Sequence, residues 1–263
     1  MNNSTRIFFH IALMNNYQSI VDELVTDIDD SGLYSLVDNI DVGLVGGHKK
    51  QLNTLPDKYN IKFESSNLKL YEKPTLTMLH EYSKSYDGKV LYIHTKNARN
   101  KTPLDNREPK MWKTWASREV HRRYMSNFMI YNHTECMNLL FKHDAVGCDF
   151  RNTPENTSHF AGNFWWANCD YIRTLPAWDK PMFRITGTMG RNPRHYCERW
   201  LLCYNNEDNN MDTPRHKCLF WGAECRKRDS NINKILNLSK REQNDWFDEM
   251  RVLQHQGKFP KRI

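Results

Sequence analysis

The chain has 263 residues, of which 39% are hydrophobic, and its mean hydropathy is −0.81. This length fits one large domain or two small ones, and it is enough to bury a substantial core. No stretch approaches the roughly 18 consecutive apolar residues that a membrane-spanning helix needs, so we expect a soluble protein with no membrane span. Residues 6–14 are too short for a secretory signal and lack a small-residue cleavage site, so we interpret them as a strand.

Cysteine usage points to a reducing compartment. The seven cysteines are odd in number and follow no close framework, which indicates free thiols and a cytoplasmic location.

The formal net charge is +7, but it is unevenly distributed. Residues 1–60 hold 4 Lys/Arg and 8 Asp/Glu, a net charge of −4, which leaves +11 for the rest of the chain. A basic body indicates an anionic partner such as nucleic acid or a phosphate-bearing ligand. Basic and aromatic residues do not interleave in one stripe, and no RRM, KH or zinc-finger pattern is present. A nucleic-acid-binding module is therefore the alternative interpretation, and we expect no nucleic acid partner.

The first hundred residues predict alternating strands and helices. Apolar runs and helical spacing of apolar residues predict strands at 7–13, 41–47, 59–63 and 89–94 and helices at 17–28 and 75–86. This β-α-β-β-α-β order predicts an α/β fold with a mostly parallel central sheet flanked by helices.

The second half is predicted from weaker patterns. A polar loop at 97–109 is followed by a largely helical segment at 110–140, with a break near Asn132. A strand is expected at 145–150 and a helix is expected to begin at Glu198. From residue 205 the chain is predicted to be irregular until a helix near 240–253.

The segment 158–172 contains two adjacent tryptophans, Trp165 and Trp166, at the end of a predicted strand that turns into a helix. Neighbouring side chains on a strand point to opposite faces, so we expect one indole to pack inward and the other to lie on the rim of a cleft. A flat indole beside small and amide residues suits the apolar face of a sugar ring. The alternative is that both tryptophans fill a core.

Several nucleotide and hydrolase motifs are absent. The first strand is not followed by G-x-G-x-x-G, and neither G-x-x-x-x-G-K-[ST] nor G-x-S-x-G occurs. These absences argue against a dehydrogenase, a P-loop NTPase and an α/β-hydrolase.

Four stretches carry a resemblance to a known family. They are the strand Val90-Leu91-Tyr92-Ile93-His94-Thr95-Lys96-Asn97, the segment Val146-Gly147-Cys148-Asp149, the block Gly162-Asn163-Phe164-Trp165-Trp166-Ala167 and the element Glu198-Arg199-Trp200. With the order of elements, they resemble a GT-A-fold glycosyltransferase, and more closely the small enzymes with which bacteria and large DNA viruses build surface glycans. The resemblance covers roughly residues 5–205.

The resemblance implies one Rossmann-like GT-A domain over residues 1–263. Its halves would be a nucleotide-sugar half at 1–100 and an acceptor half at 101–205, followed by a C-terminal extension at 206–263. The implied activity moves one sugar from a nucleotide sugar to a hydroxyl of a glycan acceptor, an oligosaccharide or a glycoprotein glycan. UDP is the expected carrier, xylose and glucose are both left open, and inversion is preferred over retention. A catalytically inactive glycan-binding protein of the same fold is the alternative.

The sharpest departure from the family lies after the strand at 90–94. The GT-A pattern places an Asp-x-Asp motif there, which holds a divalent metal on the diphosphate. This chain has His94-Thr95-Lys96-Asn97 instead, and a lysine repels a cation. We therefore expect Lys96, with Arg99 or His94, to replace the metal, and we predict no required cofactor and no metal ligands. The alternative is that Lys96 is an exposed loop lysine.

An inverting transfer also needs a base. Many inverting GT-A enzymes carry it at the start of a helix after the acceptor-binding strand, and Glu198 matches that position. Its alternative role is a helix-start carboxylate that favours the helix dipole. Asp149, at the end of a strand, is the second candidate; it could instead fix donor hydroxyls or cap the following loop.

The remaining candidate residues follow from the implied fold. We expect the donor to be bound by His10, Ala12, Gly46, Glu72, His94, Lys96, Asn97, Arg99, Arg151 and Arg194. The expected acceptor-binding residues are Gly162, Asn163, Trp165 and Trp166.

Overall fold

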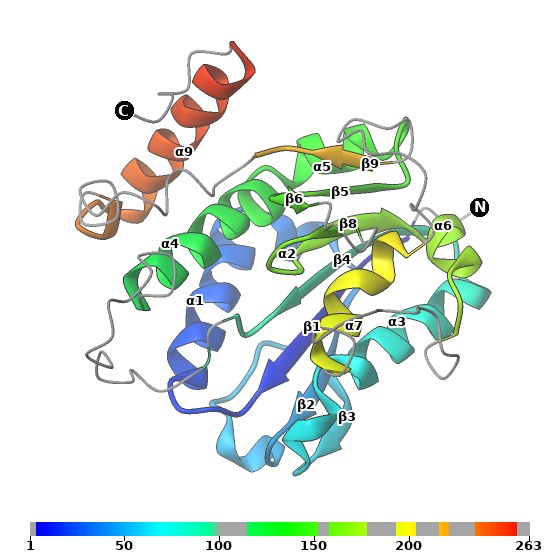
Figure 1. Ribbon diagram of the computed structural model, residues 1–263. Helices are drawn as coiled ribbons and strands as arrows, with labels where there is room; N and C mark the ends of the chain where they lie inside the picture. The colour runs from blue at the N-terminus through cyan, green and yellow to red at the C-terminus, as the bar shows by residue number, and fades with distance from the viewer. Residues whose placement is uncertain are drawn as a thin grey trace.

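The predicted alternation of elements gives a seven-stranded sheet between helices (Figure 1). The computed structural model describes residues 4–96, 98, 115–151, 158–177, 193–203, 216–220 and 235–256. The first half contains β1 (Ser4–Ala12), α1 (Tyr17–Asp30), α2 (Leu33–Leu36), β2 (Asn39–Val45), η1 (Lys49–Gln51), β3 (Tyr59–Ser65), η2 (Leu68–Leu70), α3 (Lys73–Ser85) and β4 (Gly88–His94). All six elements predicted for this half are therefore confirmed.

The second half contains shorter elements. They are α4 (Trp115–Ser126), η4 (Asn127–Tyr131), α5 (His133–Leu139), β5 (Ala145–Gly147), β6 (Phe150–Arg151), β7 (His159–Phe160), β8 (Trp165–Asn168), α6 (Cys169–Thr174), α7 (Pro193–Arg199), η6 (Trp200–Leu202), β9 (His216–Cys218) and α9 (Lys240–His255). The predicted break near Asn132 is confirmed, because a π-helical turn, η4, separates α4 from α5 there.

The sheet order is β3-β2-β1-β4-β8-β5-β9. Strands β1 to β4 pair in parallel, β8 is antiparallel to β4 and to β5, and β9 is parallel to β5. The mostly parallel α/β class is thus confirmed. From β1 the chain builds outward through β2 and β3 and then returns to β4 on the other side of β1. The crossing between β1 and β4 is a topological switch point, where open sheets of this kind bind ligands.

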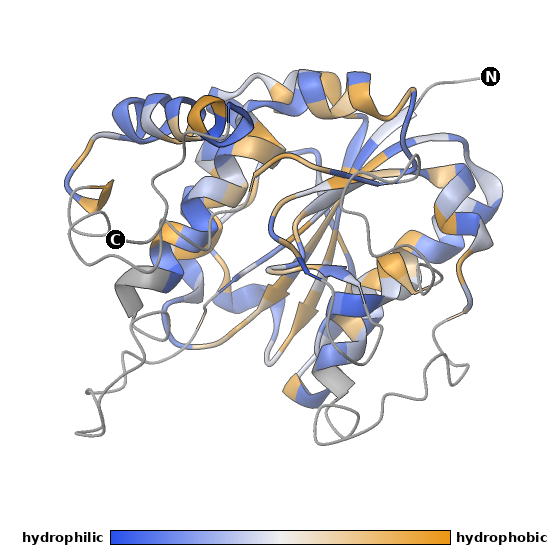
Figure 2. Cartoon of the chain, turned by 45° about the horizontal axis from the view of Figure 1, so that its top comes forward, coloured by the Kyte–Doolittle hydropathy of each residue, from blue (hydrophilic) through white to orange (hydrophobic). Residues whose placement is uncertain are grey.

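Each face of the sheet has its own apolar core. On β1, Phe9 belongs to the core under α1, α4 and α9, whereas its neighbour Phe8 belongs to the core under α3 and α6. Figure 2 shows hydrophobic residues concentrated in the central strands, while the helices carry both hydrophobic and hydrophilic residues. Within the parts of the chain that the structure describes, no helix is long and apolar enough to cross a membrane.

The two tryptophans begin β8 rather than end a strand, and they lie on opposite faces as predicted. Trp165 stacks on Tyr92, with ring centroids 5.1 Å apart, and the Trp166 indole N–H donates to the carbonyl of Met129 at 2.7 Å. Their exposed fractions are 1% and 0%, so the expectation that one indole lies on a cleft rim is wrong. The reason is that β8 pairs with strands on both sides while helices cover both faces.

Two other expectations are corrected. Glu198 is the penultimate residue of α7 and does not begin a helix, so a favourable interaction with a helix N-terminus does not apply to it. The strand expected at 145–150 is split, because Asp149 has a φ of +51° between β5 and β6.

The predicted helix near 240–253 is confirmed as α9, but the described parts of the C-terminal extension are not an irregular tail. Strand β9 forms an edge of the sheet, and α9 lies beside α4 (Figure 1). Asp248 accepts hydrogen bonds from Asn127 at 3.0 Å and Asn132 at 3.2 Å, and Phe247 is fully buried in the core. A capping box formed by Ser239 and Glu242 starts the helix. These contacts make α9 part of the fold.

We expect Phe247→Ala to lower the free energy of unfolding by about 3 kcal/mol, because it leaves a cavity in the core between α9 and α4. Val252→Ala on the same helix is the matched control, since Val252 is 54% exposed and its truncation should change stability by less than about 0.5 kcal/mol. Urea denaturation of both variants measures the difference. Equal, small effects would show that α9 does not stabilise the domain.

Candidate functional site

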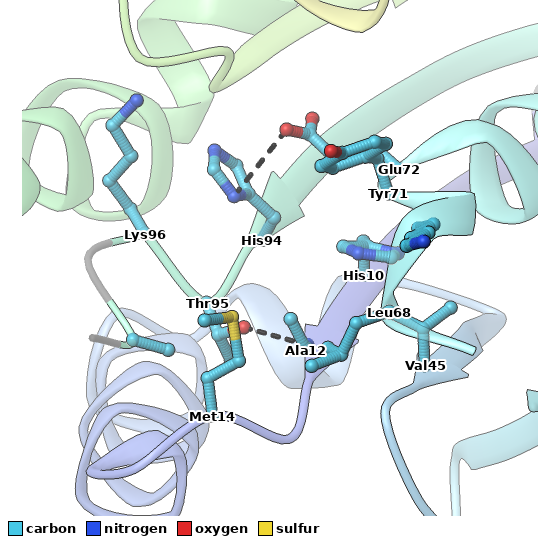
Figure 3. Close-up of a pocket in the computed structure, with 12 residues that line it drawn as sticks. His10, Ala12, Met14, Val45, Leu68, Tyr71, Glu72, His94, Thr95 and Lys96 are labelled. Atoms are coloured by element: carbon cyan, nitrogen blue, oxygen red, sulfur yellow. Dashed lines mark hydrogen bonds and ion pairs between the residues drawn. The ribbon is translucent and has the colours of Figure 1, made fainter. Parts of the chain in front are cut away.

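A cavity of about 230 Å³ opens at the switch point, where β1, β2 and β4 end (Figure 3). It is lined by His10, Ala12, Met14, Val45, Leu68, Lys69, Tyr71, Glu72, His94, Thr95, Lys96 and Ala98. Five of the predicted donor-binding residues are therefore brought together here: His10, Ala12, Glu72, His94 and Lys96. Four of them meet because the carboxyl ends of the parallel strands β1 and β4 lie at one edge of the sheet, and Glu72 joins them from the N-terminus of α3.

The segment after β4 is tied to the end of β1. The backbone N–H of Thr95 donates to the carbonyl of His10 at 3.0 Å, and the Thr95 hydroxyl oxygen accepts from the backbone N–H of Ala12 at 2.9 Å. Lys96, the next residue, is only 8% exposed, so the alternative that it is an exposed loop lysine is wrong. Its Nζ lies 3.7 Å from Oε1 of Glu198 on α7. The two groups singled out from the sequence as diphosphate ligand and base thus form an ion pair.

Glu72 is a buried acid of the cavity. Its Oε2 accepts hydrogen bonds from the Tyr92 hydroxyl at 2.9 Å and from Asn163 Nδ2 at 2.5 Å, while its Oε1 lies 3.9 Å from His94 Nδ1. Burial, and then the charge of Glu72, raise the pKa of Tyr92 well above its usual value. The Tyr92 hydroxyl therefore keeps its proton and remains a donor to the carboxylate.

The block 162–167, which was predicted to bind an acceptor, holds residues of the cavity wall in place through hydrogen bonds. The Trp165 indole N–H donates to Asn163 Oδ1 at 2.8 Å, and the His94 Nε2–H donates to the carbonyl of Gly162 at 2.8 Å. Gly162 has a φ of +108°, and a Cβ there would lie 2.4 Å from Met125 Sδ, so only glycine fits. None of the four predicted acceptor residues lines the cavity.

Strained backbone gathers around the same cavity. Tyr71, which lines it, has a φ of +51°, and Asn163, which holds Glu72, has a φ of +59°. Left-handed backbone at a non-glycine residue is costly and persists where the surroundings enforce it, often at functional sites.

His10 is neutral at physiological pH. Its Nδ1 lies 2.9 Å from the Thr75 hydroxyl oxygen, and burial lowers its pKa from 6.5 to about 4. The charge of Glu72 acts in the opposite direction and that of His94 in the same direction. An uncharged imidazole in the cavity wall can accept or donate a hydrogen bond to a ligand.

Asp149 does not reach the cavity lining. It is 1% exposed, its Oδ2 accepts from the Tyr124 hydroxyl, and His121 Nε2 lies 3.5 Å from the same oxygen. Its carbonyl accepts from the backbone N–H of Ala161 at 3.0 Å, beside Gly162. Asp149 thus contacts the backbone beside Gly162, which in turn holds His94 at the cavity.

The other predicted donor-binding residues either do not line the cavity or lie outside the residues that the structure describes. Gly46 directly follows β2 with a φ of +87°, and a Cβ there would lie 2.5 Å from Leu68, which lines the cavity. Arg151 is exposed on β6 opposite His159 and does not line the cavity. Asn97 and Arg99 lie outside the described residues, and Arg194 lies in α7 with a side chain outside the description.

The sequence did not single out several residues that the fold brings to the site. Thr95 lay within a quoted segment, and its position after a buried strand was a usable signal. Tyr92 lies within the same segment but inside the buried strand, and neither it nor Thr75 could be assigned a role from the sequence, because their roles depend on which neighbour they face. Among the described residues, no group of three or more His, Cys, Asp or Glu side chains is arranged to hold a metal ion.

Residues 8–212 match the family described as Domain of unknown function (DUF8361). The chain belongs to this family. The DUF8361 match contains every residue that lines the cavity, together with Glu198, and leaves out β9 and α9. No curated protein matches the chain.

We expect the free energy of unfolding to fall as the pH drops from 6.5 towards 4. In that window the unfolded chain protonates His10, with a pKa near 6.5, but the folded chain does not, so acid favours unfolding by up to about 3 kcal/mol. His10→Asn should remove this part of the pH dependence, which urea denaturation at pH 7.5 and 4.5 measures. His80, whose pKa is also lowered, acts equally in both proteins. The same loss of stability in wild type and variant would contradict the assignment.

Proposed function

We propose that this DUF8361 domain is a glycosyltransferase that moves one sugar from a nucleotide sugar, UDP-linked by preference, to a hydroxyl of a glycan. The observation that carries the proposal is a buried lysine, Lys96, at the mouth of a switch-point cavity that also contains a fixed carboxylate, Glu72. A mostly parallel sheet with its cavity between β1 and β4 agrees with the GT-A resemblance.

The cavity suits one part of such a donor. Its volume of about 230 Å³ is below the roughly 300–1,000 Å³ of ligand pockets in general, so it would hold a nucleoside or a sugar rather than a whole nucleotide sugar. Ala12, Val45 and Leu68 supply apolar wall, and Tyr71 supplies an aromatic ring. The diphosphate would then extend past Lys96.

Lys96 would neutralise the departing diphosphate. An ammonium in a largely buried site interacts with phosphate more strongly than it would in water, and it can take over the charge stabilisation that a metal otherwise provides. The backbone that carries Lys96 is fixed to β1 through Thr95, so the charge is held at the sheet edge before the donor arrives.

Glu198 would act as the base that takes the proton of the acceptor hydroxyl. In the structure its carboxylate lies 3.7 Å from Lys96 Nζ. An inverting transfer needs the base on the face of the sugar opposite the leaving diphosphate. Lys96 and Glu198 would therefore separate as Lys96 turns to the phosphates. Asp149, the second candidate base, is assigned a supporting role, because its contacts are with Tyr124, His121 and the backbone of Ala161.

A hydrolysis assay over a panel of nucleotide sugars in EDTA tests the proposal. We expect one UDP-sugar to be cleaved without added metal, and Lys96→Met to slow that cleavage about 100-fold, because a charge that stabilises the leaving group is lost. Lys142→Met is the matched control, since Lys142 is exposed and does not line the cavity.

Two outcomes would count against this assignment. If the protein neither cleaves nor transfers any nucleotide sugar of the panel, the proposed glycosyltransferase activity is wrong. If cleavage depends fully on Mn²⁺ or Mg²⁺, the proposal that Lys96 replaces the metal is wrong.

A further inference from the structure

Strand β3 is the outermost strand on one side of the sheet and carries a groove along its outer side. In the described sheet it pairs with β2 alone, in parallel (Figure 1). The groove has a volume of about 450 Å³ and is lined by residues 59–64 of β3 together with Lys49. Six consecutive strand residues span roughly 20 Å. The groove therefore follows β3 for most of its length, as an added strand would.

The backbone of β3 offers hydrogen-bonding groups to this groove. The carbonyl of Ser65 accepts from the backbone N–H of Gly46 at 2.8 Å, so the peptide groups of Ser65 are turned towards β2. These groups alternate between the two sides of a strand, so those of Glu64 are turned the opposite way, towards the groove. Backbone groups on an outer strand are a template for pairing with another chain.

A β-bulge places a lysine beside an acid at the groove. Phe63 pairs with Gly43, whereas Lys62, just before it, has no counterpart on β2. Lys62 and Glu64 are both exposed, and both line the groove. Residues two apart on a strand lie on the same face of the sheet, so these opposite charges are neighbours, with Phe63 between them on the other face.

The carboxylate of Glu64 is held at the groove by η1. Its Oε1 lies 3.0 Å from His48 Nδ1, and its Oε2 accepts from the backbone N–H of Lys49 at 2.5 Å. The side chain is still 34% exposed. A carboxylate has about four acceptor positions, so Glu64 can accept a further donor from the solvent side.

The order Lys62-Phe63-Glu64 is complementary to itself. When a second β3 lies antiparallel in the groove, with a two-fold axis through Phe63, each Lys62 lies opposite the Glu64 of the other copy. The two Phe63 side chains then meet on the axis. Opposite charges and aromatic pairs across neighbouring strands are both favourable. An axis through Lys62 or through Glu64 would instead place like charges opposite each other, which is unfavourable.

The same charges disfavour other partners. Lysine on an outer strand is a common protection against pairing with unrelated chains. Here the lysine is matched by a strand that presents an acid at the opposite position, which a second copy of this chain does twice. The occupant that the charge pattern fits is therefore another β3.

We propose that two copies of this chain associate through β3, antiparallel about a two-fold axis at Phe63, so that their sheets become continuous. Backbone hydrogen bonds supply the attraction, and the two Lys62–Glu64 pairs set the register. The contact is confined to one strand from each copy, so its dissociation constant falls in the micromolar range. The inference goes beyond the proposed function, because the groove and the cavity share no lining residue.

Sedimentation equilibrium of the full chain, from about 1 to 300 µM, tests the proposal. Wild type should change from monomer to dimer over this range. Lys62→Glu places acids opposite acids at two positions and should weaken the dimer at least about tenfold. Lys142→Glu is the matched control, since Lys142 is exposed and does not line the groove, and it should leave the dimer unchanged.

Two further measurements keep the test decisive if one variant folds poorly. Glu64→Lys should also be monomeric alone, but an equimolar mixture with Lys62→Glu should form a heterodimer, because the acidic strand then lies opposite the basic one. In wild type, the backbone N–H of Glu64 should exchange its hydrogen more slowly at 300 than at about 1 µM, because the partner strand protects it.

Three results would overturn the proposal. The first is a wild type that stays monomeric over the whole range, which would leave the groove to a different extended chain. The second is a dimer that Lys62→Glu and Lys142→Glu weaken equally. The third is a mixture of folded Lys62→Glu and Glu64→Lys chains that forms no heterodimer.

Discussion

The strand β8 is the constraint on which the rest of this structure depends. It is the one antiparallel strand of the described sheet, it pairs on both sides, and its two tryptophans fill the cores on opposite faces. A buried indole N–H needs an acceptor, and the two find different ones: Met129 for Trp166 and Asn163 for Trp165. Through the second of these bonds, the packing of the sheet interior fixes a carboxylate at the sheet edge.

At the carboxyl edge of the sheet, several charged or titratable side chains lie close together in the cavity. Lys96 and Glu72 are both buried there, with His10 and His94 beside them. Isolated buried charges are costly, so each must have partners: Glu72 has Tyr92 and Asn163, and Lys96 has Glu198. An anionic ligand with hydroxyl groups would complete both arrangements, the phosphates with Lys96 and the hydroxyls with Glu72. This match of charge and hydrogen-bonding groups is the reason we propose a nucleotide sugar as the ligand.

The sequence predicted the elements whose patterns are local and long. The strands β1 and β4 and the helices α1 and α3 follow from apolar runs and helical spacing, and the gathering of His10, His94 and Lys96 follows from parallel strands that end together. What it could not predict depends on contacts between distant segments. Burial of both tryptophans required β8 to be internal, and β9 has only three residues. The docking of α9 depends on Asp248 and Phe247 meeting α4 and η4. The ion pair of Lys96 with Glu198 joins residues more than a hundred positions apart.

The central claim is that Lys96 is the cation for a diphosphate and is held by Glu198 until the diphosphate binds. Calorimetric titration of UDP and uridine in EDTA, with Glu198→Gln beside Lys96→Met, tests it most directly. The account predicts that Glu198→Gln binds UDP about twofold to fivefold tighter than wild type, since the carboxylate no longer competes for the ammonium. Lys96→Met should bind UDP at least about tenfold more weakly, and neither change should alter uridine affinity. Weaker or unchanged UDP binding in Glu198→Gln, together with unchanged binding in Lys96→Met, would contradict the account.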